Sequence, residues 1–181
     1  MQRQRDKMYT GCNMRQLKIA GFTLLEMTVV MAIMGILATA AIGAYLASQQ
    51  KGRDAQRKSD LSQMQRAVEA YISDHGLYPA AIGSRIAGCG APNYDGACGW
   101  GAEFRDKNGT VYMKQLPKDP SAQQIYVYLA STDRKKYQLF ALLENKNDPA
   151  IASYTYICST SSTTCNYGAS SSNATPAEVL E

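Results

Sequence analysis

The cysteines are the residues whose type and spacing most directly suggest chemistry in this chain of 181 residues. Eight residues separate Cys89 from Cys98, and six separate Cys158 from Cys165. Close pairs of this kind are typical of disulfides, which need an oxidising compartment, and local pairing is the simplest of the three pairings that four cysteines allow. A zinc site made of all four is the alternative, although neither pair has C-x-x-C spacing and His75 is the only histidine.

The sequence contains no recognisable catalytic motif. It has no nucleophile elbow, no metal-binding helix motif, no paired-carboxylate spacing and no glycine-rich phosphate loop ending in Lys-Ser or Lys-Thr. His75 falls at the predicted end of a helix, where capping or exposure is commoner than catalysis. We therefore expect a protein that is not an enzyme and has no cofactor.

The formal net charge of +4 originates in the first 21 residues. The remaining residues, 22–181, contain 14 basic and 14 acidic side chains and are neutral overall. Nucleic acid as a partner is therefore unsupported by charge. The N-terminal segment has five basic residues against one acid: Arg3, Arg5, Lys7, Arg15 and Lys18, with Asp6.

A long apolar stretch indicates a membrane protein. The 24 residues from Met27 to Gln50 include no Asp, Glu, Lys or Arg. About 20 apolar residues span a bilayer as a helix, and the core of an ordinary secretory signal has only roughly 7–15. We predict one membrane-spanning helix over residues 22–50. Five basic residues flank it on each side, so basic residues alone do not orient it. The disulfides favour an N-terminus in the cytoplasm, with Cys12 on the reducing side, and a C-terminal domain outside.

The junction before this helix is the most specific motif of the chain. A basic leader ends at Gly21, Phe22 follows, and Glu26 interrupts the apolar helix at its fifth residue. Together these residues resemble the class III signal of the type IV prepilin and type II secretion pseudopilin family. The resemblance implies that a membrane prepilin peptidase removes the leader, residues 1–21, by cleavage between Gly21 and Phe22. It also implies N-methylation of Phe22.

Glu26 needs a partner because an ionisable side chain inside a membrane costs roughly 2.5–3.5 kcal/mol. It lies one helical turn from Phe22, so an ammonium group freed there by cleavage can neutralise it within a chain or between chains. The resemblance implies that this pairing aligns each incoming subunit in a growing filament. The alternative is that Glu26 only lies at the level of the lipid headgroups.

The predicted fold is α+β, with one long N-terminal helix packed on a small antiparallel sheet. Its second half, residues 51–75, is amphipathic, and Asp54 and Lys58 are spaced to pair across one turn. Gly76 and Pro79 are expected to end the helix. The resemblance implies the same architecture. The apolar positions at helical spacing are Leu61, Met64, Val68, Tyr71 and Ile72.

The rest of the chain is predicted to form a globular head. The glycine-rich residues 76–110 are expected to be a variable connecting loop region, residues 111–158 an antiparallel sheet, and residues 159–181 a polar loop and tail. The segment Leu116–Pro120 resembles a turn of secretion pseudopilins, and the Cys158–Cys165 loop resembles the disulfide-bounded region of pilin heads. Alternating patterns predict strands at Gln124–Ala130, Lys136–Leu143 and Ser153–Cys158.

Two binding possibilities are secondary. Oxygen ligands at Glu144, Asn145, Asn147 and Asp148 resemble the calcium-binding region of secretion pseudopilins, but their spacing departs from the 12-residue loop of an EF-hand. We expect no metal, with calcium as the alternative.

The tyrosines of the sheet could stack on DNA beside lysines, although such stripes are more often core: Tyr126, Tyr128, Tyr137, Tyr154 and Tyr156, with Lys135 and Lys136.

Two glycines in the apolar helix have two interpretations. Gly43 lies about where many pilins have a helix-breaking proline, so local melting in a filament is one interpretation. Close packing of helices through Gly35, Ala38, Ala41 and Gly43 is the other.

The sequence supports three hypotheses about function. The first is a type IV pilin subunit that polymerises through its helix, with sister subunits, the prepilin peptidase, membrane lipid and an assembly platform as partners. The second is the major pseudopilin of a type II secretion or competence system. The third is a single-pass membrane binding protein that never polymerises. The first two place the chain in the cytoplasmic membrane and then in a filament outside the cytoplasm.

Overall fold

A computed structural model describes residues 21–90 and 93–180. The leader therefore lies outside the described residues, apart from Gly21. The chain divides after Gly43, within its helix, into two compact units, and each is described here by itself.

One helix, α1 (Leu24–His75), accounts for 52 residues. It is long and apolar enough near its start to cross a membrane. It ends where the sequence predicts: Gly76 has a φ of +72° and donates its N–H to the carbonyl of Ile72 at 2.7 Å. This is the usual glycine end of a helix, since glycine adopts a positive φ without strain.

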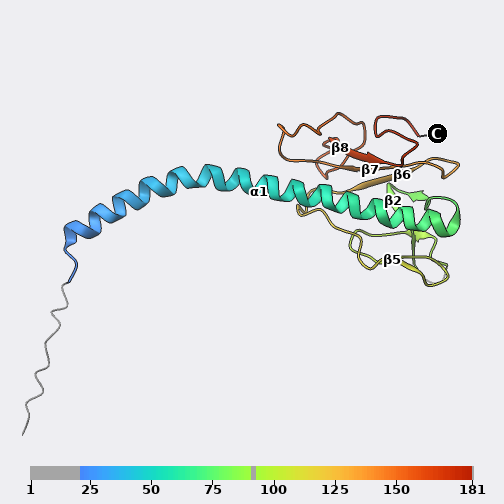
Figure 1. Cartoon of the computed structure of the whole chain (residues 1–181), viewed down its shortest axis with the longest axis horizontal. Helices are drawn as coiled ribbons and strands as arrows, with labels where there is room; N and C mark the ends of the chain where they lie inside the picture. The colour runs from blue at the N-terminus through green and yellow to red at the C-terminus, as the bar shows by residue number, and fades with distance from the viewer. Residues whose placement is uncertain (1–20, 91–92, 181) are drawn as a thin grey trace, which may run out of the picture. The chain divides into compact units, whose positions relative to one another are not determined.

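The described residues of the head form eight short strands in three antiparallel sheets, of which β2, β5, β6, β7 and β8 are labelled in Figure 1. Their orders are β1-β2-β3, β4-β5 and β6-β7-β8. The central strand β7 pairs Leu139 with Tyr128 of β6 on one side and with Ala169 of β8 on the other. The strands are β1 (Ala81–Ile82), β2 (Arg85–Cys89), β3 (Gly96–Ala97), β4 (Phe104–Arg105), β5 (Val111–Met113), β6 (Val127–Ala130), β7 (Tyr137–Ala141) and β8 (Tyr167–Ser170).

The core lies between the second half of α1 and the sheets. In Figure 1, β6–β8 are on one side of this part of α1 and β5 is on the other. The predicted apolar face of the helix is confirmed: Leu61, Met64 and Val68 are buried, and Tyr71 and Ile72 pack against the same cluster. The helix and the sheets thus bury one another's apolar faces in an α+β, pilin-like arrangement.

The tyrosines of the sheet are core residues. Tyr126, Tyr128 and Tyr137 are at most 1% exposed and belong to the cluster under α1. Tyr154 and Tyr156 pack on Phe140, each with ring centroids 4.9 Å from it. Packing within the head therefore accounts for these rings, the commoner use of such tyrosine stripes.

Three predicted segments differ from the structure. Residues 76–110 contain β1–β4 rather than only loops. The third predicted strand, Ser153–Cys158, is wrong: it contributes only an isolated bridge from Ile157 to Thr164. The third strand of the main sheet is instead β8, within the predicted tail. Its Gly168 lies so close to Phe140 that an added Cβ would be 2.9 Å from that ring.

Candidate functional site

The start of α1 is closed by a reciprocal hydrogen-bond pair between Thr23 and Glu26. The backbone N–H and hydroxyl of Thr23 donate to Oε2 of Glu26 at 2.8 and 2.9 Å, and the backbone N–H of Glu26 donates to the Thr23 hydroxyl at 3.2 Å. This is a capping box, which satisfies N–H groups that the first turn of a helix leaves free. It holds the Glu26 carboxylate at the start of the helix.

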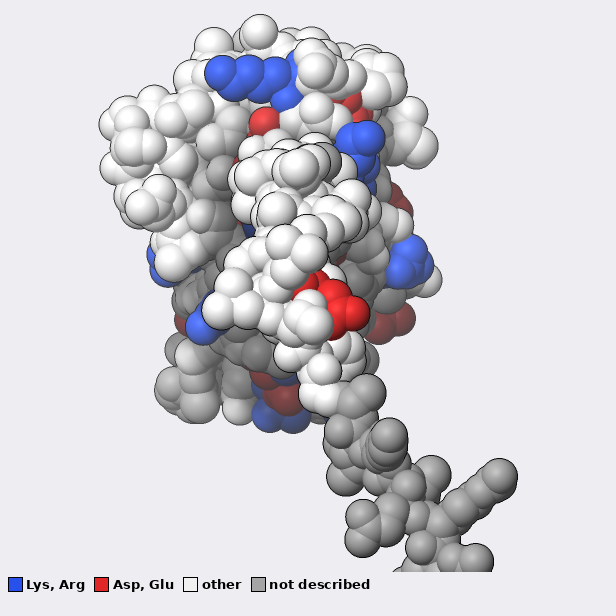
Figure 2. Space-filling view, turned by 90° about the vertical axis from the view of Figure 1, so that its left-hand side faces the viewer, with Lys and Arg blue, Asp and Glu red and all other residues white. Residues whose placement is uncertain are grey.

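The surroundings of this cap are apolar and open. Phe22 is 80% exposed, Leu24 83% and Leu25 72%. All side chains described between residues 21 and 50 are exposed in the isolated chain. Glu26 is the only charged residue between residues 21 and 50. In Figure 2 the surface nearest the viewer is largely white, with an acidic patch in red. Apolar surface of this extent requires lipid or other protein chains to cover it.

The predicted junction residues are therefore neighbours at one end of the chain's apolar segment. Gly21 and Phe22 immediately precede the capping residue, Thr23. Glu26 already accepts bonds from Thr23, while its other oxygen, Oε1, has no partner among residues 21–90 and 93–180. A carboxylate with one free oxygen at an exposed helix start is able to bind a cationic group from another chain.

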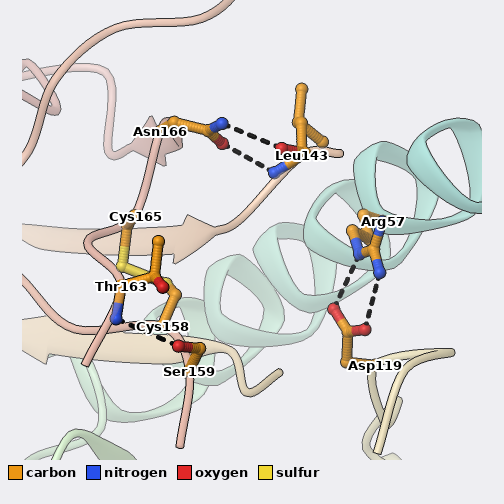
Figure 3. The surroundings of a disulfide bond; sticks show 8 residues. All are labelled: Arg57, Asp119, Leu143, Cys158, Ser159, Thr163, Cys165 and Asn166. Atoms are coloured by element: carbon orange, nitrogen blue, oxygen red, sulfur yellow. Dashed lines mark hydrogen bonds and ion pairs between the residues drawn. A yellow bond between two sulfur atoms is a disulfide. The ribbon is translucent and has the colours of Figure 1, made fainter. Parts of the chain in front are cut away.

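Both cysteine pairs are disulfide-bonded, as local pairing predicts. Cys89 is bonded to Cys98, and Cys158 to Cys165, with Cα atoms 4.9 and 5.0 Å apart. The second pair is buried and closes a loop in which the N–H of Thr163 donates to the hydroxyl of Ser159 (Figure 3). The zinc alternative is wrong, because no cysteine of these pairs has a free thiol.

A buried cluster of charges ties three segments of the head together. Arg57 of α1 is fully buried and donates from Nε and Nη2 to both carboxylate oxygens of Asp119, at 2.8 and 2.9 Å (Figure 3). It also donates to Asp54 at 2.7 Å and to Glu144 at 2.8 Å. Asp119 belongs to the Leu116–Pro120 segment, so the aspartate of that turn anchors it to the helix.

Glu144 receives a second guanidinium from Arg53. The hydrogen bonds from Arg53 and Arg57 lower the pKa of Glu144 from its ordinary value to about 2, against the opposing effect of burial. The expected Asp54–Lys58 pair is not formed. Lys58 instead donates to Asp148 at 2.6 Å, and Asp54 accepts the backbone N–H groups of Glu144 and Asn145 at 2.9 and 2.8 Å.

His75 has structural contacts at the end of α1. Its Nε2 lies 3.1 Å from Oδ2 of Asp106 and 3.2 Å from the hydroxyl of Tyr112, and its ring stacks on Tyr71 with centroids 4.2 Å apart. These contacts attach the last turn of the helix to β5 and the loop after β4.

Comparison with known proteins places this arrangement in a class. Residues 17–42 match the prokaryotic N-terminal methylation motif, which covers the junction, the capping box and most of the apolar segment. A chain that begins its exposed apolar helix with this motif and packs the helix's second half on a small antiparallel sheet is a prepilin-type protein.

Proteins with similar sequences show which family within this class the chain belongs to. The type II secretion system core protein G of Vibrio cholerae is 31% identical over 125 residues, which are 69% of this chain and 80% of that protein. The proteins of the same name from Aeromonas hydrophila and Pseudomonas aeruginosa are 31% and 28% identical over 59% and 71% of this chain, and 71% and 86% of their own lengths. This chain belongs to the type IV prepilin and type II secretion pseudopilin family. No solved structure matches it significantly.

Sequence reasoning missed three residues of these sites. Thr23 is the first residue of a Thr-x-x-Glu pattern before an apolar run, which is a recognised signal for a helix start. Arg57 and Asp119 have no such local signal, since 62 positions separate them.

Proposed function

We propose that this protein is a structural filament subunit, a major pseudopilin of a type II secretion or related envelope system, and not an enzyme. The relatives named core protein G support this alternative of the sequence analysis more than its first prediction, a type IV pilin. The single observation that carries the proposal is the apolar start of α1, capped by Thr23 and Glu26 and left exposed by residues 21–90 and 93–180.

The proposed assembly begins with cleavage between Gly21 and Phe22 by a prepilin peptidase on the cytoplasmic side of the membrane. Cleavage converts the amide nitrogen of Phe22 into an amine, which is then methylated and remains cationic. Before assembly, lipid covers the apolar segment and the head lies outside the cytoplasm. During assembly, helices of sister subunits replace the lipid, at a platform in the membrane.

Glu26 has a specific role in this scheme. Its free oxygen accepts the Phe22 ammonium of a neighbouring subunit, while its other oxygen stays bonded to Thr23. Because charges in a low-dielectric medium interact strongly, correct axial position of the incoming helix is favoured over positions in which the charges are apart.

The test is a deletion strain complemented with this chain. We expect the deletion to abolish export of a secreted protein and the complementing chain to restore it. Mass spectrometry of the complementing chain should show a mature N-terminus at methylated Phe22. Export that is unaffected by the deletion, with abundant sheared surface fibres made of this chain, would instead identify a type IV pilin. An N-terminus at Met1 in the membrane-inserted protein would contradict both filament functions and leave the non-polymerising membrane protein.

A matched pair of variants tests the processing step. Gly21→Val places a bulky side chain at the cleavage position, and we expect the precursor to accumulate uncut. Gly52→Val lies on the same helix beyond the apolar segment, where an added Cβ meets nothing within 4 Å, and is the control. Equal processing of both variants would show that Gly21 is not part of the recognised junction.

A further inference from the structure

The loop that follows β7 is held to α1 by fixed cationic side chains. Its residues Glu144 and Asp148 face Arg53, Arg57 and Lys58 of the helix. The guanidinium of Arg57 is at the centre, completely buried, with Asp54, Asp119 and Glu144 around it. The second half of α1 thus presents three positive charges to four carboxylates: Asp54, Asp119, Glu144 and Asp148.

Each oxygen of these four carboxylates already accepts a hydrogen bond. In Asp54, Oδ1 accepts from Arg57 and from the backbone of Glu144, and Oδ2 from the backbone of Asn145. Both oxygens of Asp119 accept from Arg57, and Oδ1 also accepts from the backbone of Ser121.

The loop carboxylates are equally saturated. Oε1 of Glu144 accepts from Arg53 and Arg57, and Oε2 accepts from Arg53. In Asp148, Oδ2 accepts from Lys58 and Oδ1 from the backbone of Ala150 at 2.9 Å. The bonds to Asp54 come from the loop's own backbone, so the helix fixes the path of the loop as well as its side chains.

These residues do not fit a calcium ion. Calcium takes six to eight oxygen ligands at about 2.3–2.6 Å, mostly from carboxylates and carbonyls. Of the four oxygen-bearing residues in the sequence pattern, Glu144 and Asp148 are bound to cations, and Oδ1 of Asn145 accepts the backbone N–H of Asn147. An ion at this place would have to separate Glu144 from two guanidinium groups and Asp148 from an ammonium group. No group of three or more His, Cys, Asp or Glu residues suited to a metal occurs among the residues that the structure describes.

We propose that Arg57, with Arg53 and Lys58, is the resident cation of this loop, so that the head closes the loop and stays folded without any divalent metal. The positive charge that a metal would supply comes from the helix itself. Formation of the loop is therefore coupled to the docking of α1 and of the Leu116–Pro120 segment, since Arg57 joins all three.

The first test is thermal unfolding of the full chain in detergent micelles, followed by near-ultraviolet circular dichroism. Samples contain excess EGTA, millimolar calcium chloride, or millimolar magnesium chloride at equal ionic strength. We expect the melting temperatures to agree within about 1 °C, because no ligand site is available to shift them. A rise of about 5 °C or more that calcium produces and magnesium does not would overturn the proposal.

The second test removes the cation. Arg57→Gln leaves Asp54 and Asp119 without a counter-charge and Glu144 with Arg53 alone. Because breaking a buried ion pair is strongly destabilising, we expect the melting temperature in EGTA to fall by about 10 °C or more. The side chain of Arg53 is partly exposed, so Arg53→Gln should lower the melting temperature by only a few degrees. This variant tests the proposal even if Arg57→Gln does not fold. Arg66→Gln is the control, since the bond of Arg66 within the described part of the chain is to the hydroxyl of Ser62, outside the cluster. Wild-type melting of Arg53→Gln and Arg57→Gln in EGTA would show that the guanidinium groups do not hold the loop.

Discussion

The two halves of α1 differ in where their side chains find partners. Between Leu24 and Gln50, every side chain that the structure describes is exposed. From Asp54 to Val68, the inward residues are buried against three sheets or bonded to buried charges. The second half is therefore part of a self-sufficient head, whereas the first half depends on lipid or on other chains.

Two carboxylates, one within the first half and one bound to the second half, illustrate this difference. Glu144, which meets the second half, is held by two guanidinium groups of its own chain. Glu26, in the first half, has only the local bonds of a helix cap. The Glu144 carboxylate, whose partners are all in its own chain, stabilises the monomer. The Glu26 carboxylate, which has a free oxygen, is available to a partner from another chain. Variants of the two should accordingly affect different measurements.

The largest effect is expected at Glu26. Glu26→Gln keeps an oxygen for the Thr23 cap but removes the charge. Loss of about 1.4 kcal/mol of pairing free energy lowers an association constant tenfold, so we expect filament yield to fall on the order of tenfold or more. The melting temperature of the head should not change. Pelleted filaments, quantified by immunoblot against total membrane-inserted protein, provide the measurement.

Thr23→Val is the matched control for this variant, because it removes the cap and keeps the charge. We expect it to assemble better than Glu26→Gln. If Glu26→Gln filaments form at wild-type yield, the charge-pairing argument fails, and the carboxylate serves only to start the helix.

The second effect concerns acid stability of the head. The low pKa of Glu144, about 2, means that its ionised form is favoured by folding. Its contribution, at most about 3 kcal/mol, is complete above the ordinary pKa of 4.5 and is lost as the pH falls toward 2. Asp60 acts in the opposite direction, because burial raises its pKa. We expect Glu144→Gln to lower stability at neutral pH and to make its decline in acid shallower.

Denaturant titrations at several pH values measure this change. Glu103→Gln is the comparison, since Glu103 is an exposed carboxylate paired with Arg105 outside the cluster. Parallel acid profiles for wild type and Glu144→Gln would show that another group causes the acid sensitivity.

A somewhat smaller effect is expected for the second disulfide. Replacing Cys158 and Cys165 together by alanine releases a short loop, at a cost of about 2–3 kcal/mol by the chain-entropy estimate. This lowers the melting temperature by about 5–10 °C in oxidising buffer and leaves membrane insertion unchanged. Unchanged melting would mean that the bond contributes nothing to the stability of the head.

The smallest effect is expected at Gly43. In the isolated chain an added Cβ meets nothing within 4 Å, and alanine favours a helix by about 1 kcal/mol relative to glycine. Gly43→Ala should therefore leave the head's melting temperature unchanged. If Gly43 either melts or packs closely in the filament, assembly yield falls, though less than for Glu26→Gln. Wild-type yield would exclude both roles, and Gly52→Ala is the control on the same helix.

Local signals explain which parts of the structure can be predicted from the sequence. The end of α1 follows from Gly76 and Pro79, and strands β6 and β7 follow from alternating apolar residues. Strand β8 has no such signal, because Tyr-Gly-Ala-Ser lacks β-branched residues and its glycine is required by the close approach of Phe140.

The charge cluster was unpredictable for a related reason. Asp54 and Lys58 have the spacing of a helical pair, yet Asp54 pairs with Arg57 and accepts backbone N–H groups from a loop about 90 positions away, where Lys58 also finds its partner, Asp148. Long-range pairing of this kind depends on the packed fold, so spacing along the chain gives no indication of it. The junction at Gly21 and Phe22, by contrast, depends on contiguous residues.

The capping box also bears on the proposed removal of the leader. Both of its members lie on the C-terminal side of the bond between Gly21 and Phe22, and the three hydrogen bonds of the box run between Thr23 and Glu26 themselves. Proteolysis would therefore change the charge at the new chain end without unravelling the first turn. The mature subunit would inherit a helix whose boundary is already set, with only one residue, Phe22, ahead of Thr23.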